Sequence, residues 1–374
     1  MRFQSTPLSE VCEVIMGQAP VGASYNENGE GLPLIAGAGD FGSVTPSPKK
    51  HTTAASKISQ VGDLILCIRA TIGDLNWGDK EYCLGRGVAG LRPKKSVLNK
   101  DYLWHFIQAN KHQLSVKGTG STFKQVSRSH IAEWEIPLPP LSEQKRIATI
   151  LDKADAIRRK RQQAIQLADE FLRAVFLDMF GDPVTNPKGW EVRPVGEICG
   201  CIVPGRDKPK SFTGSTPWIT TNELNHLGIT TKKEKFIGLS EEEIAEVKAK
   251  VVPAGSVLMT CVGDLGVVSI AGDDMVINQQ LHAFLLSDFV TPSFLSYALA
   301  WQKEYMLRMS SSTTVPYMNK TVCNSVPVVL PPTSLQERFE KIVEKVTESK
   351  AVMSVDSGAN LFESISQRSF SGEL

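Results

Sequence analysis

The chain contains an internal repeat, and this repeat limits its possible folds more than any other feature. Segment 136–147 reads IPLPPLSEQKRI and segment 328–339 reads VVLPPTSLQERF, so six of twelve positions are identical at an offset of 192. Residues 62–65 match 255–258 at a similar offset, and Gly181 matches Gly372. Collinear matches with so little drift indicate one unit of about 190 residues written twice, which makes the repeat the organising feature of the fold.

Both copies show the same order of secondary-structure signals. Short apolar runs broken by Gly, Pro, Asn and Thr predict strands, at 32–36, 63–69 and 87–92 in one copy and at 216–221, 256–262 and 280–286 in the other. A short apolar helix is expected near 100–110 and near 291–307. Each copy then continues with Pro-Pro, a serine that could cap a helix (Ser142 or Ser334), and a long amphipathic stretch.

The amphipathic stretch of the first copy predicts a long helix. No Gly or Pro occurs from 143 to 180, and a helix of 38 residues measures about 57 Å. Eight of ten positions on two neighbouring heptad rows are apolar: 147, 154, 161, 168, 175 and 150, 157, 164, 171, 178. Such a stripe must be buried. We expect it to pair with its own repeat, 334–370, whose middle is interrupted near Gly358; the alternative is that each helix packs on its own β region.

Composition and terminal sequence bound the protein class. Of the residues 41% are apolar and 22% charged, a composition typical of a globular protein. The net charge is only +1, so no overall positive charge attracts the protein to a polyanion. No apolar run is long enough to span a bilayer, and the N-terminus lacks a hydrophobic signal region. Seven cysteines without a Cys-x-x-Cys pattern fit reduced thiols. We therefore expect a cytoplasmic protein.

The sequence offers no convincing catalytic or metal-binding motif. The glycines at 37, 39 and 42 have dinucleotide-binding spacing, but the following Ser and Pro residues cannot open a helix. Six histidines form no spaced ligand pair. Glu246 and Lys248 could belong to a nuclease triad, yet segment 240–250 fits a capped surface helix better. We expect no catalytic residues, no metal and no cofactor on this chain.

The segment at 136–147, followed by a long helix, resembles the specificity (S) subunit of type I restriction-modification systems, the HsdS family. Segments 171–182 and 367–374 are similar to the family's two helix-end motifs, and 61–66 and 253–258 to its recurring Pro-Gly-Asp-Leu-Leu strand. The resemblance implies an α+β protein with two tandem-repeated mixed α/β target recognition domains, separated by two long helices that form an antiparallel coiled coil. The implied domains are recognition domain 1 (1–140), a central helix (141–182), recognition domain 2 (183–331) and a C-terminal helix (332–374).

The same resemblance implies a non-catalytic, sequence-specific DNA-recognition subunit. Each recognition domain would read one half of a bipartite site on double-stranded DNA, and the coiled coil would set the spacer and dock two methyltransferase (M) subunits. S-adenosylmethionine and methyl transfer would belong to the M subunits, and ATP-driven cleavage to restriction (R) subunits. Two alternatives stay open: a self-contained nuclease or methyltransferase with an unrecognised active site, and a coiled-coil scaffold that binds only proteins.

Local charge bears on how DNA would be held. Residues 1–140 have a net charge of +3 and residues 181–330 one of −2, so phosphates must be bound by local patches. Arg and amide side chains read bases, and Lys and hydroxyls contact phosphates. The expected DNA-binding residues are Arg69, Arg86, Lys117, Thr119, Ser121 and Lys124 in the first copy, and Arg206, Lys208, Lys210, Asn222, Gln279, Gln280, Asn319 and Lys320 in the second.

Helix residues near the repeated segment are expected to hold partner subunits. Arg161 sits within the apolar stripe, where a guanidinium favours partner packing over DNA contact. The expected partner-binding residues are Gln144, Arg146, Arg158, Arg161, Gln336 and Arg338.

Overall fold

The protein is described by a computed structural model that covers residues 3–119, 124–205, 207–311, 314–355 and 358–373. The chain forms two compact units: unit 1 is Met1–Gln162 with Asp356–Leu374, and unit 2 is Gln163–Val355. The units therefore divide the long helices between them, whereas the sequence placed its domain boundaries at the helix ends.

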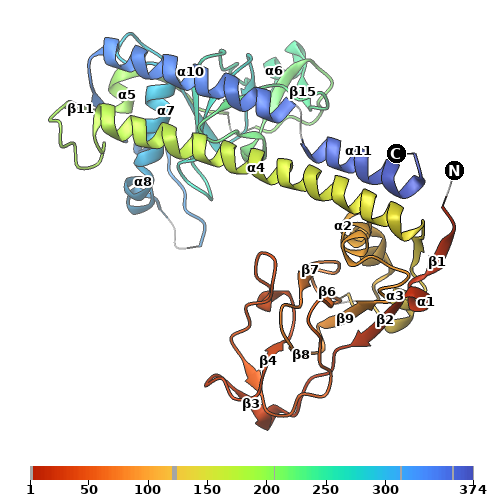
Figure 1. Ribbon diagram of the computed structural model, residues 1–374. Helices are drawn as coiled ribbons and strands as arrows, with labels where there is room; N and C mark the ends of the chain where they lie inside the picture. The colour runs from red at the N-terminus through yellow and green to blue at the C-terminus, as the bar shows by residue number, and fades with distance from the viewer. Residues whose placement is uncertain (1–2, 120–123, 206, 312–313, 356–357, 374) are drawn as a thin grey trace. The chain divides into compact units, whose positions relative to one another are not determined.

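The described residues of unit 1 form three small sheets (Figure 1). An antiparallel sheet has the strand order β2 (Cys12–Met16), β9 (Val88–Pro93), β6 (Leu64–Cys67) and β7 (Leu75–Trp77). A mixed sheet has the order β3 (Tyr25–Asn26), β5 (His51–Thr52), β4 (Leu32–Ile35) and β8 (Cys83–Leu84). Strand β1 (Ser5–Pro7) pairs with β10 (Glu135–Pro137).

Unit 2 repeats this plan. Its largest sheet has the order β12 (Gly200–Ile202), β19 (Leu281–Leu285), β16 (Val257–Thr260), β17 (Val268–Ala271) and β14 (Ile229–Thr230). A second sheet has the order β15 (Gly238–Leu239), β13 (Thr216–Ile219) and β18 (Val276–Ile277), and β11 (Glu191–Pro194) pairs with β20 (Pro327–Leu330). All six predicted strands are confirmed, and the two-copy α+β plan is present.

Helices pack against these sheets in both units. Unit 1 has α1 (Leu8–Val11), α2 (Lys100–Lys117) and α3 (Arg128–Ala132), and unit 2 has α5 (Val195–Ile198), α6 (Glu241–Glu246), α7 (Pro292–Trp301), α8 (Lys303–Met309) and α9 (Lys320–Asn324). The described residues also form the short 3₁₀ helices η1 (Gly22–Ser24), η2 (Ala38–Asp40) and η3 (Thr221–Glu223). The predicted apolar helix near 291–307 is thus two helices, α7 and α8. Helix α6 has a Ser240–Glu243 capping box, which confirms the surface-helix interpretation of that segment.

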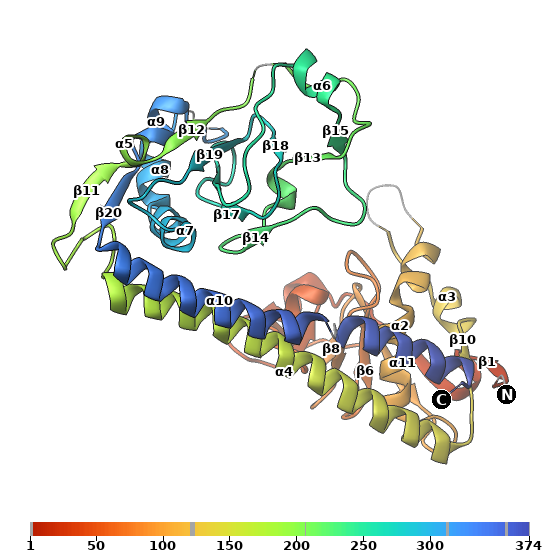
Figure 2. The same cartoon turned by 90° about the horizontal axis from the view of Figure 1, so that it is seen from above.

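The predicted long helix is α4, a continuous helix of 40 residues from Leu141 to Phe180. Its second half lies beside α10 (Thr333–Val355) in unit 2, and its first half lies beside α11 (Gly358–Ser371) in unit 1 (Figures 1 and 2). The pairing of α4 with α10 is antiparallel, because Phe180 contacts Phe339 while Asp169 forms an ion pair with Lys350. The predicted C-terminal long helix is therefore two helices, with residues 356–357 between them outside the described residues.

The buried face of α4 follows neither predicted heptad row along its whole length. In unit 1 the buried residues include Ile147 and Ala154 of the first row, but the buried Leu172, Phe176 and Phe180 of unit 2 lie on neither row. On the second row Ile157 is 48% exposed and Phe171 52% exposed, so the prediction that these positions are buried was wrong. A straight helix has 3.6 residues per turn, so the residues on its buried face are spaced by three and four. Positions seven residues apart gradually rotate away from that face.

Both helix starts differ from the prediction in the same way. Helix α4 begins at Leu141 and α10 at Thr333, so Ser142 and Ser334 lie inside the first turn and are not the capping residues. The carbonyl of Pro140 accepts from the backbone N–H groups of Glu143 and Gln144, and that of Pro332 accepts in the same way from Leu335 and Gln336. Proline suits this place, because it can precede a helix without a donor of its own.

A buried glutamine next to each helix start joins the helix to its unit. Gln144 has no exposed surface; its Oε1 accepts from the Asn99 backbone N–H (2.8 Å), and its Nε2 donates to the carbonyls of Val97 (2.9 Å) and Pro139 (2.8 Å). Gln336 makes the equivalent bonds, with the Thr291 N–H (3.0 Å) and the carbonyls of Phe289 and Pro331 (both 2.9 Å). The glutamine that repeats in the sequence is a structural anchor.

We predict that Gln144→Ala and Gln336→Ala each destabilise their own unit. Each change leaves a backbone N–H and two carbonyls without the amide that satisfied them, which we expect to cost about 2–4 kcal/mol of unfolding free energy. Unfolding in urea measures the loss of stability, and amide hydrogen exchange shows which unit has lost it. Exchange should be faster in unit 1 for Gln144→Ala and in unit 2 for Gln336→Ala. The exposed Gln163→Ala on α4 is the control. Equal stability of all three variants would contradict the anchoring role.

Candidate nucleic-acid interface

Three loops meet at one end of the antiparallel sheet of unit 1. The loop after β6 contains Ile68 and Arg69, the loop between β8 and β9 contains Arg86, and the third part consists of the described residues 118–119 and 124–126 that follow α2. The Ile68 N–H donates to the Gly87 carbonyl (2.9 Å), and the Ile68 carbonyl accepts from the Val126 N–H (3.0 Å). One residue thus ties all three loops through its backbone. We call this arrangement the three-loop site.

Unit 2 contains the same three-loop site, built from equivalent residues. The Cys261 N–H donates to the Gln280 carbonyl (2.8 Å), and the Cys261 carbonyl accepts from the Met318 N–H (2.9 Å). The bridges match as well: Arg69 and Thr119 pair with Gln125 in unit 1, and Val262 and Ser311 pair with Tyr317 in unit 2. Because these links use the backbone, side chains at the site can differ without altering the scaffold.

A glycine allows the loop after β6 to pack closely against helix α2 in unit 1. Gly73 has φ +99°, a conformation that favours glycine, and a Cβ there would lie 2.5 Å from the Cβ of Lys111. Gly266 holds the equivalent place in unit 2 with φ +75°.

The structure brings together most of the residues predicted to bind DNA in the first copy. Arg69, Arg86, Thr119 and Lys124 lie in the three-loop site, and Lys117 ends the helix that leads into it. Arg86, Lys117, Thr119 and Lys124 are exposed. The Nε of Arg69 is buried without a hydrogen-bond partner among the described residues, so this guanidinium has unused donor capacity. Ser121 lies outside the described residues.

In the second copy, three predicted residues line one pocket of about 690 Å³: Lys208, Gln279 and Gln280. The Nε2 of Gln279 also donates to the Gly205 carbonyl (3.3 Å), which connects this loop to the segment that carries Lys208. The aromatic residues Phe212, Trp218 and Tyr317 line the same pocket, and sequence reasoning missed them. The sequence contained one signal for Tyr317: it lies 192 residues after Gln125, the repeat offset, and next to a proline, which places it in the loop equivalent to that of Gln125.

The remaining predicted DNA-binding residues of the second copy have other surroundings. The side chain of Asn319 accepts from the Val322 N–H (3.0 Å) as the N-cap of α9, and the exposed Lys320 follows it. Lys210 lies 3.6 Å from Glu246, and Asn222 is exposed on η3. Neither Lys210 nor Asn222 lines the pocket. Arg206 lies outside the described residues.

The predicted partner-binding residues separate into buried anchors and surface arginines. Gln144 and Gln336 are fully buried and bonded within their units, so their side chains cannot contact a partner, and that prediction was wrong. Arg146 pairs with Glu143 (2.8 Å), and Arg338 is exposed. Arg158 pairs with Asp155 (2.7 Å) and lies over the ring of Phe362, and Arg161 is half-buried with contacts inside the chain.

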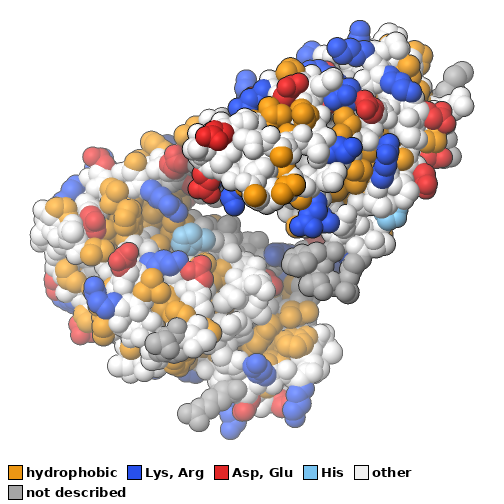
Figure 3. All heavy atoms as spheres, turned by 90° about the horizontal axis from the view of Figure 1, so that it is seen from below, with side chains coloured by type: hydrophobic (Ala, Val, Ile, Leu, Met, Phe, Trp, Pro, Cys, Tyr) orange, Lys and Arg blue, Asp and Glu red, His pale blue; other side chains and the backbone are white. Residues whose placement is uncertain are grey.

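The electrostatics of the described surface match the small net charge. Basic and acidic side chains are interspersed on the face shown in Figure 3. Among the described residues, no three His, Cys, Asp or Glu side chains lie where they could hold a metal ion. No described helix is long and apolar enough to cross a membrane. The chemical groups that the three-loop sites offer are guanidinium, ammonium, amide, hydroxyl and aromatic groups, which suit base edges and phosphates.

A carboxylate holds the segment that carries Lys208 and Phe212. Both carboxylate oxygens of Glu243 accept from the Thr213 N–H, and one accepts from the Thr213 hydroxyl (3.1 Å). Hydrogen bonds from the Ser211 hydroxyl and from the backbone of Ser240 and Thr213 lower the pKa of Glu243 to about 2.

Comparison with known proteins places the chain among DNA specificity proteins. The family described as "Type I restriction modification DNA specificity domain" matches residues 2–167 and 187–353. The putative type I restriction enzyme MjaX specificity subunit of Methanocaldococcus jannaschii is 33% identical over 168 residues, 44% of this chain and 40% of that protein. The MjaIX specificity subunit of the same organism is 23% identical over 332 residues, 78% of this chain and 72% of that protein.

Solved structures share the fold. A type I restriction-modification S subunit from M. genitalium has a TM-score of 0.61 at 14% identity, with 99% of this chain and 96% of that chain covered. A protein from work on complex assembly and conformational transition of the type I R-M system has a TM-score of 0.59 at 20% identity, with 100% and 98% covered.

We predict that Glu243→Ala releases the segment before β13 without unfolding unit 2. The Thr213 amide should exchange hydrogen faster, because its acceptor is lost, and the exposed Glu241→Ala should leave it unchanged. The carboxylate has a lowered pKa, so its tether is present above the ordinary pKa of a Glu and is lost as pH falls towards about 2. Exchange measured from pH 7 to pH 5 should therefore show a constant difference between wild type and variant; a difference that disappears by pH 5 would contradict this.

Proposed function

The chain belongs to the type I restriction-modification DNA specificity family, and on that premise we propose that it is the DNA-recognition subunit of a type I restriction-modification complex. Each unit reads one half of a bipartite site in double-stranded DNA. The observation that carries this proposal is the three-loop site, which occurs twice with the same backbone links and with different side chains. A scaffold duplicated in this way suits two half-sites of different sequence.

The side chains at equivalent positions indicate how the half-sites differ. Arg69 and Arg86 in unit 1 correspond to Val262 and Gln279 in unit 2. Arginine forms paired hydrogen bonds with guanine, whereas glutamine forms them with adenine. Unit 1 therefore favours guanine contacts, and unit 2 combines amide contacts with the aromatic surface of Phe212 and Tyr317.

The remaining activities of the complex belong to other subunits in this proposal. Two M subunits dock on the helices and units and carry S-adenosylmethionine, and R subunits supply ATP-driven cleavage where they are present. The exposed residues Ile157, Leu167 and Phe171 on α4, together with Arg338 on α10, offer apolar and basic surface for the M subunits. The number of residues in α4 sets the unread spacer, and the complex works in the cytoplasm.

We predict that exchanging residues 8–137 for the matching region of a related protein changes one half-site only. Co-expression with the M subunit and sequencing of methylated sites in cells measures the result. In the same assay Arg86→Ala should relax one base pair of the unit 1 half-site, a loss of about 1–3 kcal/mol of discrimination. The exposed Lys95→Ala is the control. If the methylated sites stay the same after residues 8–137 are replaced, the chain is a scaffold without a role in recognition.

We also predict that the chain alone binds DNA weakly and with strong salt dependence. A net charge of +1 leaves only local patches for phosphates, and each phosphate contact contributes a slope of about −0.9 to the plot of log affinity against log salt. Fluorescence anisotropy with a labelled duplex, from 50 to 200 mM salt, tests this. Nanomolar sequence-specific binding by the chain alone at physiological salt would be the opposite result.

A further inference from the structure

A cluster of thiols around one imidazole lies in unit 2. Its members are Cys201 on β12, Cys261 directly after β16, His282 on β19 and Cys323 on α9. Cys261, His282 and Cys323 are buried, with exposed fractions of 1%, 4% and 0%, and Cys201 is half-buried. The Cys261 side chain interacts with those of Cys323 and His282, and the imidazole also interacts with Cys201. We call these four side chains the thiol cluster.

Unit 1 has apolar side chains at the equivalent places. The repeat offset, the strand registers and the helix caps identify the equivalents, which are Val14 for Cys201, Ile68 for Cys261, Ala89 for His282 and Ile131 for Cys323. All four are buried in the core of unit 1. The scaffold can therefore be packed here with alkyl groups alone, and the thiol cluster is particular to unit 2.

Contacts within the thiol cluster favour a charged pair. Hydrogen bonds from the Cys323 thiol and from the His282 imidazole lower the pKa of the Cys261 thiol to about 6, although burial opposes this change. Burial disfavours a charged imidazole, but the interactions with Cys201 and Cys261 outweigh it and raise the pKa of His282 to about 9. At neutral pH Cys261 is therefore a thiolate beside an imidazolium, an arrangement that makes a cysteine nucleophilic.

The backbone holds the Cys261 and Cys323 thiols on either side of one residue. The Met318 N–H donates to the Cys261 carbonyl (2.9 Å), and the Cys323 Sγ lies 3.8 Å from the Met318 carbonyl oxygen. Hydrogen bonding to Cys261 and burial raise the pKa of Cys323, so this second thiol keeps its proton. A disulfide between the two sulfurs would join two segments that are already held together.

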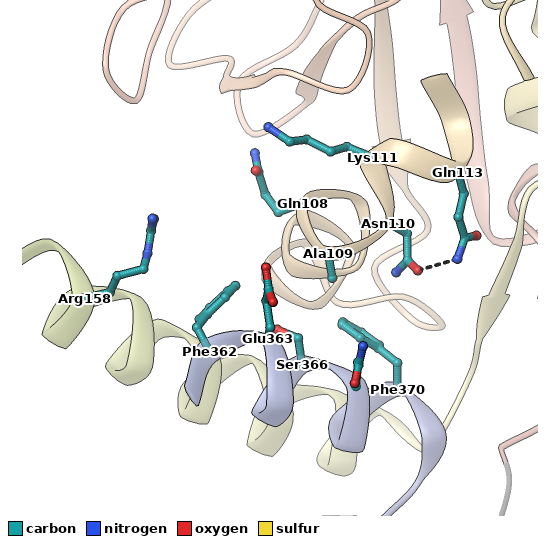
Figure 4. Close-up of a pocket in the computed structure, with 11 residues that line it drawn as sticks. Gln108, Ala109, Asn110, Lys111, Gln113, Arg158, Phe362, Glu363, Ser366 and Phe370 are labelled. Carbon is teal, nitrogen blue, oxygen red and sulfur yellow. Dashed lines mark hydrogen bonds between the residues drawn. The ribbon is translucent and has the colours of Figure 1, made fainter. Parts of the chain in front are cut away.

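Access is the remaining requirement, because both thiols are buried. The pocket of about 690 Å³ in unit 2 is lined by Val262 and Gln279, and the Cys261 Sγ lies 3.7 Å from the Gln279 carbonyl oxygen. The nucleophilic sulfur thus lies behind the wall of this pocket, where local opening admits a molecule as small as a peroxide. In unit 1 the pocket of about 760 Å³ shown in Figure 4 has neither a cysteine nor a sequence neighbour of one among the described residues that line it.

We propose that Cys261 and Cys323 are a modification site, at which a peroxide converts the two free thiols of unit 2 into a disulfide. In reducing compartments disulfides are usually transient and serve catalysis or redox sensing, which fits a pair that is reduced until an oxidant arrives. The chemistry does not depend on the proposed role in DNA recognition. It acts, however, on the residue whose backbone ties the three loops of unit 2.

The reaction has two steps. In the first, the Cys261 thiolate attacks one peroxide oxygen, so that an S–O bond forms and the O–O bond breaks; the hydroxide that leaves takes a proton from the His282 imidazolium and becomes water. In the second, the Cys323 sulfur attacks the sulfenic acid, so that an S–S bond forms and the S–O bond breaks; the departing oxygen takes the Cys323 proton and leaves as water. Two electrons pass from the two sulfurs to one peroxide.

Peptide mapping of the full-length folded chain tests the proposal. After treatment with millimolar hydrogen peroxide and alkylation of the remaining thiols, digestion with trypsin should yield one disulfide-linked pair, residues 251–303 joined to residues 321–338. Dithiothreitol should separate the two peptides. The rate at which the linked pair appears measures the reactivity of Cys261.

Four variants identify the site. Cys261→Ile and Cys323→Ile each supply the side chain that unit 1 carries and should remove the linked pair while the core stays packed. His282→Ala likewise supplies the alanine of unit 1 and should slow the reaction about tenfold, because the thiolate loses a hydrogen bond and a counter-charge. Cys83→Ala is the control: it removes a buried thiol of unit 1, whose pKa burial raises, and should leave rate and product unchanged.

Each contrary outcome overturns a stated part of the proposal. Absence of a linked pair in the peroxide-treated wild type, or a link from Cys261 to any other cysteine, would exclude the Cys261–Cys323 site. Oxidation of Cys261 to a sulfinic acid at the same rate in wild type and in Cys323→Ile would mean that Cys323 does not capture the sulfenic acid. An unchanged rate in His282→Ala would remove the role of the imidazole.

Discussion

The buried face of α4 is shared between two cores, and the rest of the fold depends on this division. Ile147 and Leu151 pack in unit 1, and Leu172, Phe176 and Phe180 pack in unit 2. No residue of α4 between Ala154 and Leu172 is fully buried. The two ends of the helix are therefore held by tertiary packing, while the middle is held by its own backbone hydrogen bonds and by surface pairs such as Arg158 with Asp155. Side chains in the middle can vary, but an insertion there would turn one buried face away from its core.

The two copies have kept those parts of the scaffold that act through the backbone or through buried amides. Gln144 and Gln336 satisfy equivalent groups in their units, and Ile68 and Cys261 tie equivalent loops with their N–H and carbonyl groups. A backbone link does not constrain its own side chain, so Arg69 could diverge from Val262 without loss of the loop geometry. Duplication followed by this kind of divergence produces two surfaces of different chemistry on one scaffold.

The sequence was sufficient to predict the elements and insufficient to predict their contacts. Strands and the long helix follow from local periodicity and from the absence of Gly and Pro, and the repeat doubled each signal. The burial of Gln144 could not be read from the sequence, because a glutamine near a helix start is usually exposed and only its tertiary partners Val97 and Asn99 show otherwise. The exposure of Phe171 depends on which face of α4 packs against the other helices of unit 2. Counting heptads in the sequence does not identify that face. Tyr317 reaches the unit 2 pocket through a bridge between segments distant in sequence.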